Sequence, residues 1–195
     1  MVNAMYLIFD CETTGLPRNW KAPISDLANW PRVIQLAWSL FDMADQPLES
    51  MTHLVQPDGF TIPGDVQRIH GITTERALAE GIKLPTVLEK FSGAVERSEI
   101  IIAHNVRFDE SVISAEYLRL RLKPPFADKK RICTMVQSTE LCHIQGPYGY
   151  KWPTLSQLHR ELFQSGYEEA HDAGADVAAC AKCFFELKRR RVISP

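Results

Sequence analysis

The spacing of apolar residues along the first part of the chain predicts short strands. A run from Met5 to Asp10 is apolar and ends in a carboxylate. Val33 to Phe41 and Leu48 to Gln56 predict a second and a third strand, with Gln46 and Pro47 in the turn between them. Because these strands follow one another closely, we expect an antiparallel meander.

From Thr73 onward the pattern predicts helices that alternate with strands. Leu84 to Arg97 has apolar residues at helical spacing, and the isoleucines of Glu99 to His104 predict a strand covered on both faces. In a helix that opens at Thr154 as N-cap, we expect Phe163 to point inward. The remaining expected elements are a fifth short strand, Arg131 to Met135, and helical segments at Thr73 to Glu75, Phe108 to Leu122, Thr154 to Phe163 and Asp172 to Arg191.

This order of elements predicts an α/β fold with a five-stranded mixed sheet flanked by helices, in a single domain over residues 1–195. A chain of 195 residues with 45% hydrophobic content is long enough for one sizeable core. A net charge of -2 excludes the strongly basic surface that grips long nucleic-acid duplexes. A nucleic-acid enzyme of this composition would need a local basic patch or bound metal ions.

The cysteines and the hydropathy pattern indicate a compartment. Five scattered cysteines argue against a disulfide framework and favour a reducing, cytoplasmic environment. Cys180 and Cys183 form one C-x-x-C in a helical pattern, for which we favour core packing over zinc or redox chemistry. No segment approaches the ~20 apolar residues of a membrane span, and the start of the chain lacks a secretion signal, so we expect no membrane contact.

Acidic residues occur in three segments that can share a site. Asp10 and Glu12 are two apart in a predicted strand, so their carboxylates face the same side and favour a hard divalent cation such as Mg²⁺. Taken alone, this pair is also typical of a solvated strand end. Asp109 lies in the first turn of a predicted helix, where it either joins the site or only complements the helix dipole, and Asn105 can cap that helix.

The third segment is His171 to Asp176. Asp172 can cap the last helix, and Asp176 lies one turn later on the same face, after small residues that permit close approach. A lone histidine is more often a satisfied surface residue than a catalyst. The three segments together nevertheless predict converging carboxylates that bind two cations ~3.5–4 Å apart. His171 beside them is suited to take a proton from water.

These residues resemble the DEDD superfamily of 3′–5′ exonucleases, which has the ribonuclease H-like fold. His171, five residues before Asp176, matches the subgroup that uses histidine (DEDDh). The resemblance is strongest to the epsilon proofreading-subunit type of DNA polymerase III, and it extends from Leu7 to about Leu187. Its motifs are Asp10-Cys11-Glu12-Thr13-Thr14-Gly15-Leu16, Ile69-His70-Gly71-Ile72-Thr73 and Pro153-Thr154-Leu155.

The resemblance implies roles for individual residues. The catalytic set consists of His171 as general base and four carboxylates that hold two Mg²⁺ ions, for which Mn²⁺ can substitute: Asp10, Glu12, Asp109 and Asp176. The residues expected to bind the terminal nucleotide are Thr13, Thr14, Leu16, His70, Asn105 and Phe108. For two of these an alternative stays open, since His70 can serve only the turn around Gly71 and Phe108 can be a core residue.

The chain departs from the family pattern in the long insertion Pro17 to Pro31, beside the expected pocket. Its Trp20 and Trp30 can either stack on bases or anchor the loop to the core. At the other end, Lys188 to Arg191 can bind phosphates, but we favour a role in the last helical turn, where basic residues complement the dipole.

The expected function is a metal-dependent 3′–5′ exonuclease that acts on single-stranded nucleic acid, with DNA favoured, and releases nucleoside 5′-monophosphates. The expected partners are a nucleic-acid 3′ end and a DNA polymerase subunit. Three alternatives stay open: an exoribonuclease that trims short RNA, a polymerase-associated subunit with an idle nuclease site, and a plain cation-binding module.

Overall fold

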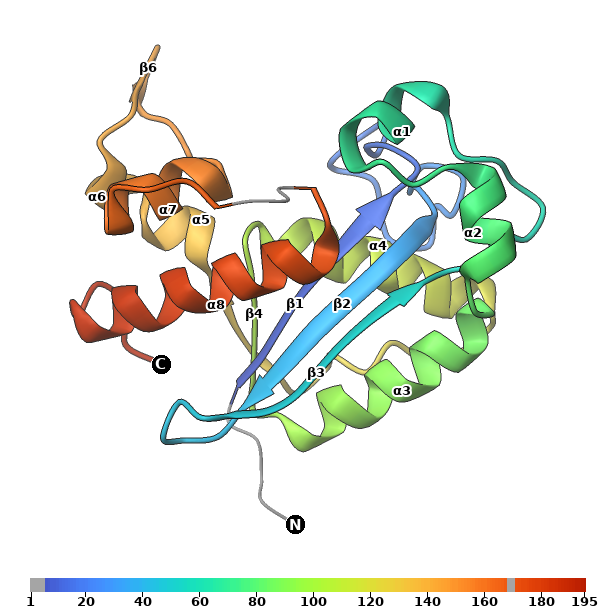
Figure 1. Ribbon diagram of the computed structural model, residues 1–195, viewed down its shortest axis with the longest axis horizontal. Helices are drawn as coiled ribbons and strands as arrows, with labels where there is room; N and C mark the ends of the chain where they lie inside the picture. Colours follow the sequence, from blue (N-terminus) through green and yellow to red (C-terminus); the bar gives the residue numbers. More distant parts are fainter. Residues whose placement is uncertain (1–5, 168–170) are drawn as a thin grey trace.

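A five-stranded sheet forms the centre of the computed structural model, which describes residues 6–167 and 171–195. The strand order is β3-β2-β1-β4-β5. β1 pairs with β2 and β2 with β3 in antiparallel fashion, whereas β4 pairs in parallel with both β1 and β5 (Figure 1). The expected mixed sheet with an antiparallel meander is confirmed. The strands are β1 (Tyr6–Thr13), β2 (Val33–Phe41), β3 (Pro47–Leu54), β4 (Ile100–Ala103) and β5 (Lys130–Cys133).

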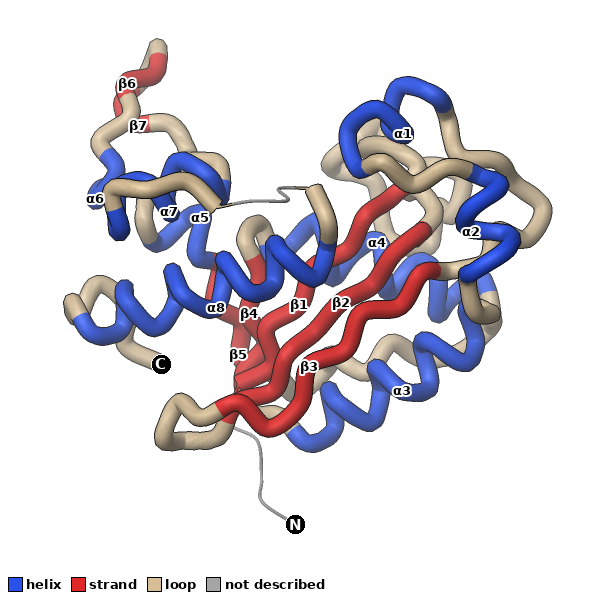
Figure 2. Tube along the Cα trace, in the orientation of Figure 1, coloured by secondary structure: helices blue, strands red, loops and turns tan. Residues whose placement is uncertain are grey.

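Helices cover both faces of this sheet, and a small hairpin projects from one side (Figure 2). The helices are α1 (Gly64–His70), α2 (Thr74–Glu80), α3 (Leu84–Arg97), α4 (Val106–Arg119), α5 (Thr134–Gln137), α6 (Thr139–Cys142), α7 (Leu155–Phe163) and α8 (Ala173–Arg189). The hairpin consists of β6 (Gln145–Gly146) and β7 (Gly149–Tyr150).

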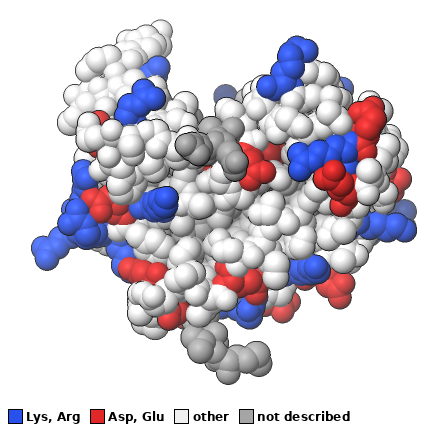
Figure 3. Space-filling view, viewed as in Figure 1, with Lys and Arg blue, Asp and Glu red and all other residues white. Residues whose placement is uncertain are grey.

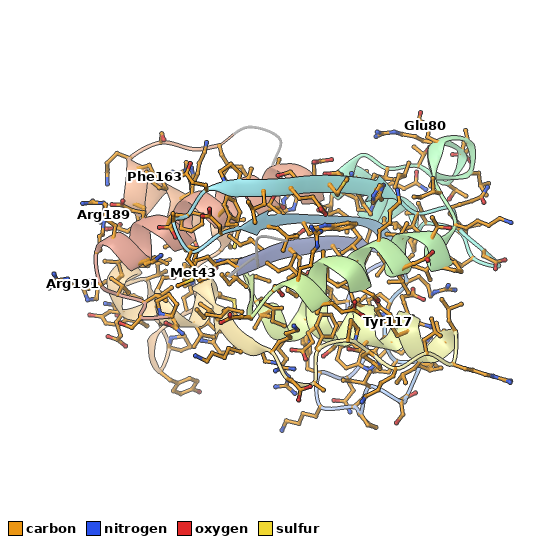
Figure 4. All side chains as sticks on the ribbon, turned by 90° about the horizontal axis from the view of Figure 1, so that it is seen from below. Met43, Glu80, Tyr117, Phe163, Arg189 and Arg191 are labelled. Atoms are coloured by element: carbon orange, nitrogen blue, oxygen red, sulfur yellow. The ribbon has the colours of Figure 1, made fainter. Side chains whose placement is uncertain are left out.

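Side-chain alternation along β1 divides the interior into two cores. Leu7 and Phe9 belong to a cluster with residues of α3 and α4, whereas Tyr6 and Ile8 belong to a cluster with α7 and α8. Figure 4 shows α3 on one side of the strands, together with the part of α4 that carries the labelled Tyr117. The sheet therefore lies between two helical layers, and alternate residues of β1 face α8.

Several details of the expected elements differ from the structure. β1 continues to Thr13, so Asp10 and Glu12 lie inside the strand rather than at its end. Phe163, expected to point inward, is 37% exposed because it is the last residue of α7 and lies beyond its buried face. Asn105 precedes α4 with a φ of 81° and makes no side-chain cap, so the proposed capping bond is absent. Helix α1 was not predicted, because none of its residues is buried and no apolar period marks it.

At α8 the core-packing interpretation of the C-x-x-C is confirmed, and the basic run at the helix end makes ion pairs that the sequence did not predict. Cys180 and Cys183 are residues of α8 with free thiols, and both are buried in the core on which the helix packs. The basic residues at its end form ion pairs within the fold: Lys188 with Asp45, and Arg189 and Arg190 with Glu186. Within the described residues, no helix combines the length and hydropathy that crossing a bilayer demands.

Candidate active site

Asp10 and Glu12 face α8 from the middle of the sheet. They continue the same side of β1 as Tyr6 and Ile8, which pack against α8, since strand residues two apart share a face. At this point β1 pairs with β2, where Asp10 lies opposite Ala37 and Glu12 opposite Gln35, whereas its pairing with β4 covers only residues 6–8. The two carboxylates are thus held in register by β2, beyond the part of β1 that β4 covers.

Asp109 reaches the same place from α4 and is 2% exposed. Its Oδ1 atom accepts hydrogen bonds from the backbone N–H of Cys11 at 3.1 Å and from the Cys11 thiol at 3.2 Å. Cys11 lies between Asp10 and Glu12, so this contact joins the start of α4 directly to the acidic part of β1. The buried aspartate has a role beyond complementing the helix dipole.

Asp176 comes from the first turn of α8. Its Oδ1 accepts a hydrogen bond from the Tyr167 hydroxyl at 2.6 Å, and its Oδ2 accepts the backbone N–H of His171 at 3.2 Å. Ligand atoms of Glu12, His171 and Asp176 lie within 4.8 Å of one another. The structure therefore brings Glu12 of β1, His171 just ahead of the α8 N-cap and Asp176 of α8 together in one group that can hold a metal ion.

Helix α8 is placed by its N-cap and by β2. Asp172 Oδ1 accepts the N–H groups of Gly174 and Ala175, as the N-cap interpretation predicts. Gln35 of β2 donates to Asp172 Oδ2 at 2.9 Å and accepts the N–H of Ala173 at 2.9 Å. An added Cβ on Gly174 would lie 2.6 Å from Thr52 Oγ1, so the small residues let α8 approach β3 rather than a substrate.

The four carboxylates strongly perturb one another. Burial, followed by the charges of Asp109, Asp176 and Glu12, raises the pKa of Asp10 well above its ordinary value. Burial and neighbouring carboxylates raise the pKa of Glu12 to about 8, and burial raises the pKa of Asp109 to about 7. Burial also raises the pKa of Asp176, although its bonds from Tyr167 and His171 oppose the shift.

The donor set of this cluster fits a hard divalent cation. Across residues 6–167 and 171–195, no lysine or arginine forms an ion pair with any of the four carboxylates. Buried carboxylates without a compensating charge are costly, and carboxylate oxygens are the ligands that Mg²⁺ and Mn²⁺ prefer. Cations at this point would therefore relieve the repulsion that raises the pKa values.

The threonines expected to bind nucleotide take part in the turn after β1. Thr13 donates its hydroxyl to the carbonyl of Gly15 at 2.7 Å, and Thr14 Oγ1 accepts the N–H of Arg32 at 2.9 Å. Arg32 in turn donates to the fully buried Glu116 at 2.8 Å. Leu16, in the same turn, is 71% exposed and thus available for contact.

His70 combines the two interpretations that the sequence left open. Its Nδ1 accepts the N–H of Ile72 at 3.0 Å, which holds the turn around Gly71, where φ is 70°. Burial and the charge of His171 lower the pKa of His70, so the two imidazoles are neighbours. Its Nε2 is buried without a hydrogen-bond partner among the described residues. The residue thus supports the turn and also borders the acidic cluster.

Asn105 and Phe108 lie where α4 begins. Asn105 has a left-handed backbone, which asparagine adopts more readily than most residues, and its side chain does not cap α4. Phe108 is half-buried against the core, and its ring centroid lies 5.7 Å from that of Trp20. Phe108 is therefore partly a core residue, as one of the two interpretations proposed, and its ring also supports Trp20 of the insertion.

The insertion 17–31 is folded onto the domain. Trp30 is buried and donates its indole N–H to Pro23, so it anchors the loop. Trp20 keeps 43% of its surface exposed, and its carbonyl accepts a bond from Arg107. Trp30 therefore anchors the loop to the core. Trp20 presents an exposed aromatic surface beside Phe108.

Sequence reasoning missed three residues of this site: Cys11, Gln35 and Tyr167. Cys11 and Gln35 lie in strands whose polar or thiol groups also occur in ordinary packing, and Tyr167 lies nine residues before its partner Asp176. Only for Cys11 was a signal present, since it stands between the two carboxylates of the D-x-E pair.

The family model described as RNase_T exonuclease matches residues 7–184. The chain belongs to the RNase_T exonuclease family. The expected DEDDh-type exonuclease, with its link to nucleases of DNA polymerase III, is confirmed. Curated relatives are the PolC-type DNA polymerase III of Lactococcus lactis, 28% identical over 97% of this chain and 10% of the relative, and that of Streptococcus pyogenes, 29% identical over 93% and 11%.

Solved structures of similar fold include two exonuclease I proteins. That of E. coli, in complex with a dT13 oligonucleotide, is 22% identical with a TM-score of 0.75, over 96% of this chain and 42% of the other. That of Methylocaldum szegediense is 21% identical with a TM-score of 0.74, over 95% and 40%. The expected ribonuclease H-like fold of this RNase_T domain is confirmed. The chain spans about a tenth of the length of the curated relatives it matches.

Proposed function

We propose that this RNase_T domain is a metal-dependent 3′–5′ exonuclease that removes nucleoside 5′-monophosphates from single-stranded DNA. The observation that carries the proposal is the convergence of four carboxylates with raised pKa values beside the imidazole of His171: Asp10, Glu12, Asp109 and Asp176. If these carboxylates did not bind metal, burying them together would only destabilise the folded state.

The proposed mechanism assigns a task to each group of residues. The four carboxylates hold two Mg²⁺ ions, or Mn²⁺ in their place; when bound, such ions lower the pKa of water and offset charge on the phosphate. His171 accepts the proton of the attacking water, since its ring nitrogen lies within 4.8 Å of carboxylate atoms of Glu12 and Asp176. Its backbone N–H is bonded to Asp176, which fixes the base relative to the acidic cluster.

The residues expected to bind the terminal nucleotide lie in the turn after β1, at the end of α1 and at the start of α4. Leu16 and Phe108 offer apolar surface to the terminal nucleotide, and Asn105 offers a side-chain amide that does not cap α4. His70 contributes by holding the turn around Gly71, because its Nε2 is buried. Thr13 and Thr14 contribute by shaping the turn, because their hydroxyls are engaged by Gly15 and Arg32. We infer that the terminal nucleotide is held chiefly by the exposed part of this set.

DNA is favoured over RNA because the curated relatives are named as DNA polymerases and one neighbouring structure contains dT13. The same relatives support a polymerase as partner, since this chain corresponds to only a tenth of their length. Five free thiols are consistent with the cytoplasmic location we propose. The exoribonuclease and the idle subunit remain the competing functions.

One experiment tests the proposal. 5′-labelled single-stranded DNA and RNA of the same sequence are incubated with the protein and Mg²⁺, with and without EDTA. A ladder that shortens from the 3′ end, release of 5′-monophosphates and loss of both with EDTA are expected. Asp10→Asn and Asp176→Asn should remove activity, whereas the exposed Asp58→Asn is the matched control. Undiminished activity in either site variant refutes the metal assignment.

A further inference from the structure

The β6–β7 hairpin and the segment after it, residues 151–153 (the arm), display aromatic side chains to solvent. Tyr148 at the tip is 102% exposed, Trp152 in the arm is 62% exposed and Tyr150 is 39% exposed. Aromatic rings are costly to leave in water, and a cluster of them on one projecting element is typical of a binding surface. The rest of the site as described above does not use these rings.

The hairpin holds its aromatic residues in a fixed arrangement. Gln145 pairs with Tyr150, and Lys151 donates its backbone N–H to Ile144 at 2.9 Å. The ring of Tyr150 packs against His143, with 4.7 Å between centroids. Because the backbone is closed and braced in this way, a ligand that stacks on the exposed rings orders little additional chain.

The arm is tied to the candidate active site through His104. A carbonyl oxygen can only accept, so His104 Nε2 donates to the carbonyl of Pro153 at 3.0 Å, and its Nδ1 accepts from Thr134 at 3.0 Å. His104 directly precedes Asn105 and lies five residues before Asp109. Trp152, next to Pro153, is therefore positioned by the same segment that carries the site residues of α4.

The charge of this stretch favours an anionic ligand. No aspartate or glutamate occurs between Glu140 and Glu161, although the chain has 24 acidic residues in 195. Lys151 and Arg160 provide positive charge within the stretch. Figure 3 shows the lobe with the hairpin as largely uncharged with isolated basic residues, and shows the surface hollowed between it and the lobe of α1. A polyphosphate backbone would meet no repulsion here.

We propose that the hairpin and its arm, residues 143–153, form a stacking platform for the bases of a single strand upstream of the 3′ end that enters the site. This rests on the proposed function and adds to it how the strand is held. Base–aromatic stacking tolerates any sequence, because every base has a π-face. It requires unpaired bases, since the faces of bases in a duplex are covered by their neighbours. The platform therefore selects single strands over duplexes.

The test separates binding from cleavage. Affinity is measured by fluorescence anisotropy in EDTA, with single-stranded DNA longer than the ~4–16 nucleotides that such surfaces cover. Tyr148→Ala with Trp152→Ala is expected to weaken binding by about 30-fold or more, because each of the two lost stacking contacts accounts for a factor of about 5 at least. Tyr148→Phe with Trp152→Phe keeps the rings and should restore affinity. Met43→Ala, exposed in the β2–β3 turn, which lies far from the hairpin (Figure 1), is the matched control.

A second measurement follows cleavage as a function of substrate length. In the alanine variant KM should rise for long single strands, and the rise should diminish as the substrate shortens to a trinucleotide. Equal affinity of wild type and alanine variant, or an equal loss at every length, overturns the platform while leaving the nuclease intact. Loss of self-association in the variant, by analytical ultracentrifugation, would show instead that the rings contact a second copy and would also overturn it. A wild type that binds but does not cleave refutes the proposed function alone.

Discussion

The hydroxyl of Tyr167 donates to Oδ1 of Asp176, while the other oxygen of this carboxylate accepts the N–H of His171. Both donors precede α8, and Asp176 is in its first turn. The segment that leads into α8 is thus bonded at two points to a carboxylate that we assign to metal binding. Asp176 both belongs to the proposed centre and fixes the position of its proposed base.

Removal of the Tyr167 hydroxyl should destabilise the metal-free protein. In Tyr167→Phe the free energy of unfolding is expected to fall by about 1–2 kcal/mol, since a hydrogen bond to a charged group is lost at a partly exposed position. This bond lowers the pKa of Asp176, so its contribution is present when Asp176 is ionised and disappears as the pH falls. Urea unfolding in EDTA at neutral and acid pH measures it, with Tyr148→Phe as control. An equal loss at both pH values would contradict this.

Substitution of His171 should slow hydrolysis without removing the cations. Its φ of 73° is a conformation that asparagine tolerates, so His171→Asn is a better test than alanine. Loss of a general base lowers the rate by ~10²–10⁴ fold. Single-turnover cleavage gives the rate, and Mn²⁺ titration by calorimetry gives the affinity. Should Mn²⁺ affinity collapse together with the rate, His171 would be a ligand rather than a base.

The pH dependence of stability should reverse when cations are bound. Glu12 and Asp109 have pKa values of about 8 and about 7 in the folded chain, against ~4 when unfolded. The folded state therefore binds more protons, and its stability in EDTA should fall as the pH rises from ~4 to ~8. Mg²⁺ should stabilise increasingly over the same range, because it binds the ionised carboxylates.

Calorimetric melting temperatures across this pH range, with EDTA or Mg²⁺, check that expectation. Glu12→Gln should flatten the decline in EDTA and weaken the response to Mg²⁺, because one of the repelling charges is gone. Asp58→Asn should follow the wild type, because Asp58 is exposed and is not among the charges that shift the pKa values of the four carboxylates. A wild type whose stability in EDTA increases over the range would show that the pKa values are not raised.

The N-cap of α8 should matter for both stability and activity. Asp172→Ala is expected to cost ~0.5–2 kcal/mol, the usual value for loss of an N-cap, and to reduce cleavage because α8 carries Asp176. Asp172→Asn preserves an acceptor for Gly174 and Ala175 and should retain most of both. Thermal unfolding and kcat/KM report the two effects. Full activity in the alanine variant would mean that the packing of α8 alone fixes the site.

The sequence predicted those elements whose pattern is set by burial. β2 and α3 have the predicted bounds, because a continuous apolar run and a clear helical period mark them. α1 has no buried residue, and β6 and β7 have two residues each, so none of them leaves a hydrophobic signal. The predicted first strand ended too early, at Asp10, because Asp10 and Glu12 interrupt the apolar run of β1. These two carboxylates belong to the candidate site.

The candidate site divides in the same way. The grouping of the carboxylates and His171 was predictable from their residue types and spacing: two carboxylates two apart in a strand, and two in the first turns of helices. Gln35 and Tyr167 were not, because their roles depend on contacts with Asp172 and Asp176 that only the folded chain creates. Nor does local sequence show that the hydroxyls of Thr13 and Thr14 are engaged in the turn.

Helix α8 packs on β1 and β2 and is the last of the helices along the chain. Asp10 and Glu12 come from the first strand, whereas Asp176, which also accepts the N–H of His171, comes from a helix far along the sequence. A truncated variant that stops before α8 would therefore lack one carboxylate of the proposed metal site and, with it, the contact that orients the proposed base.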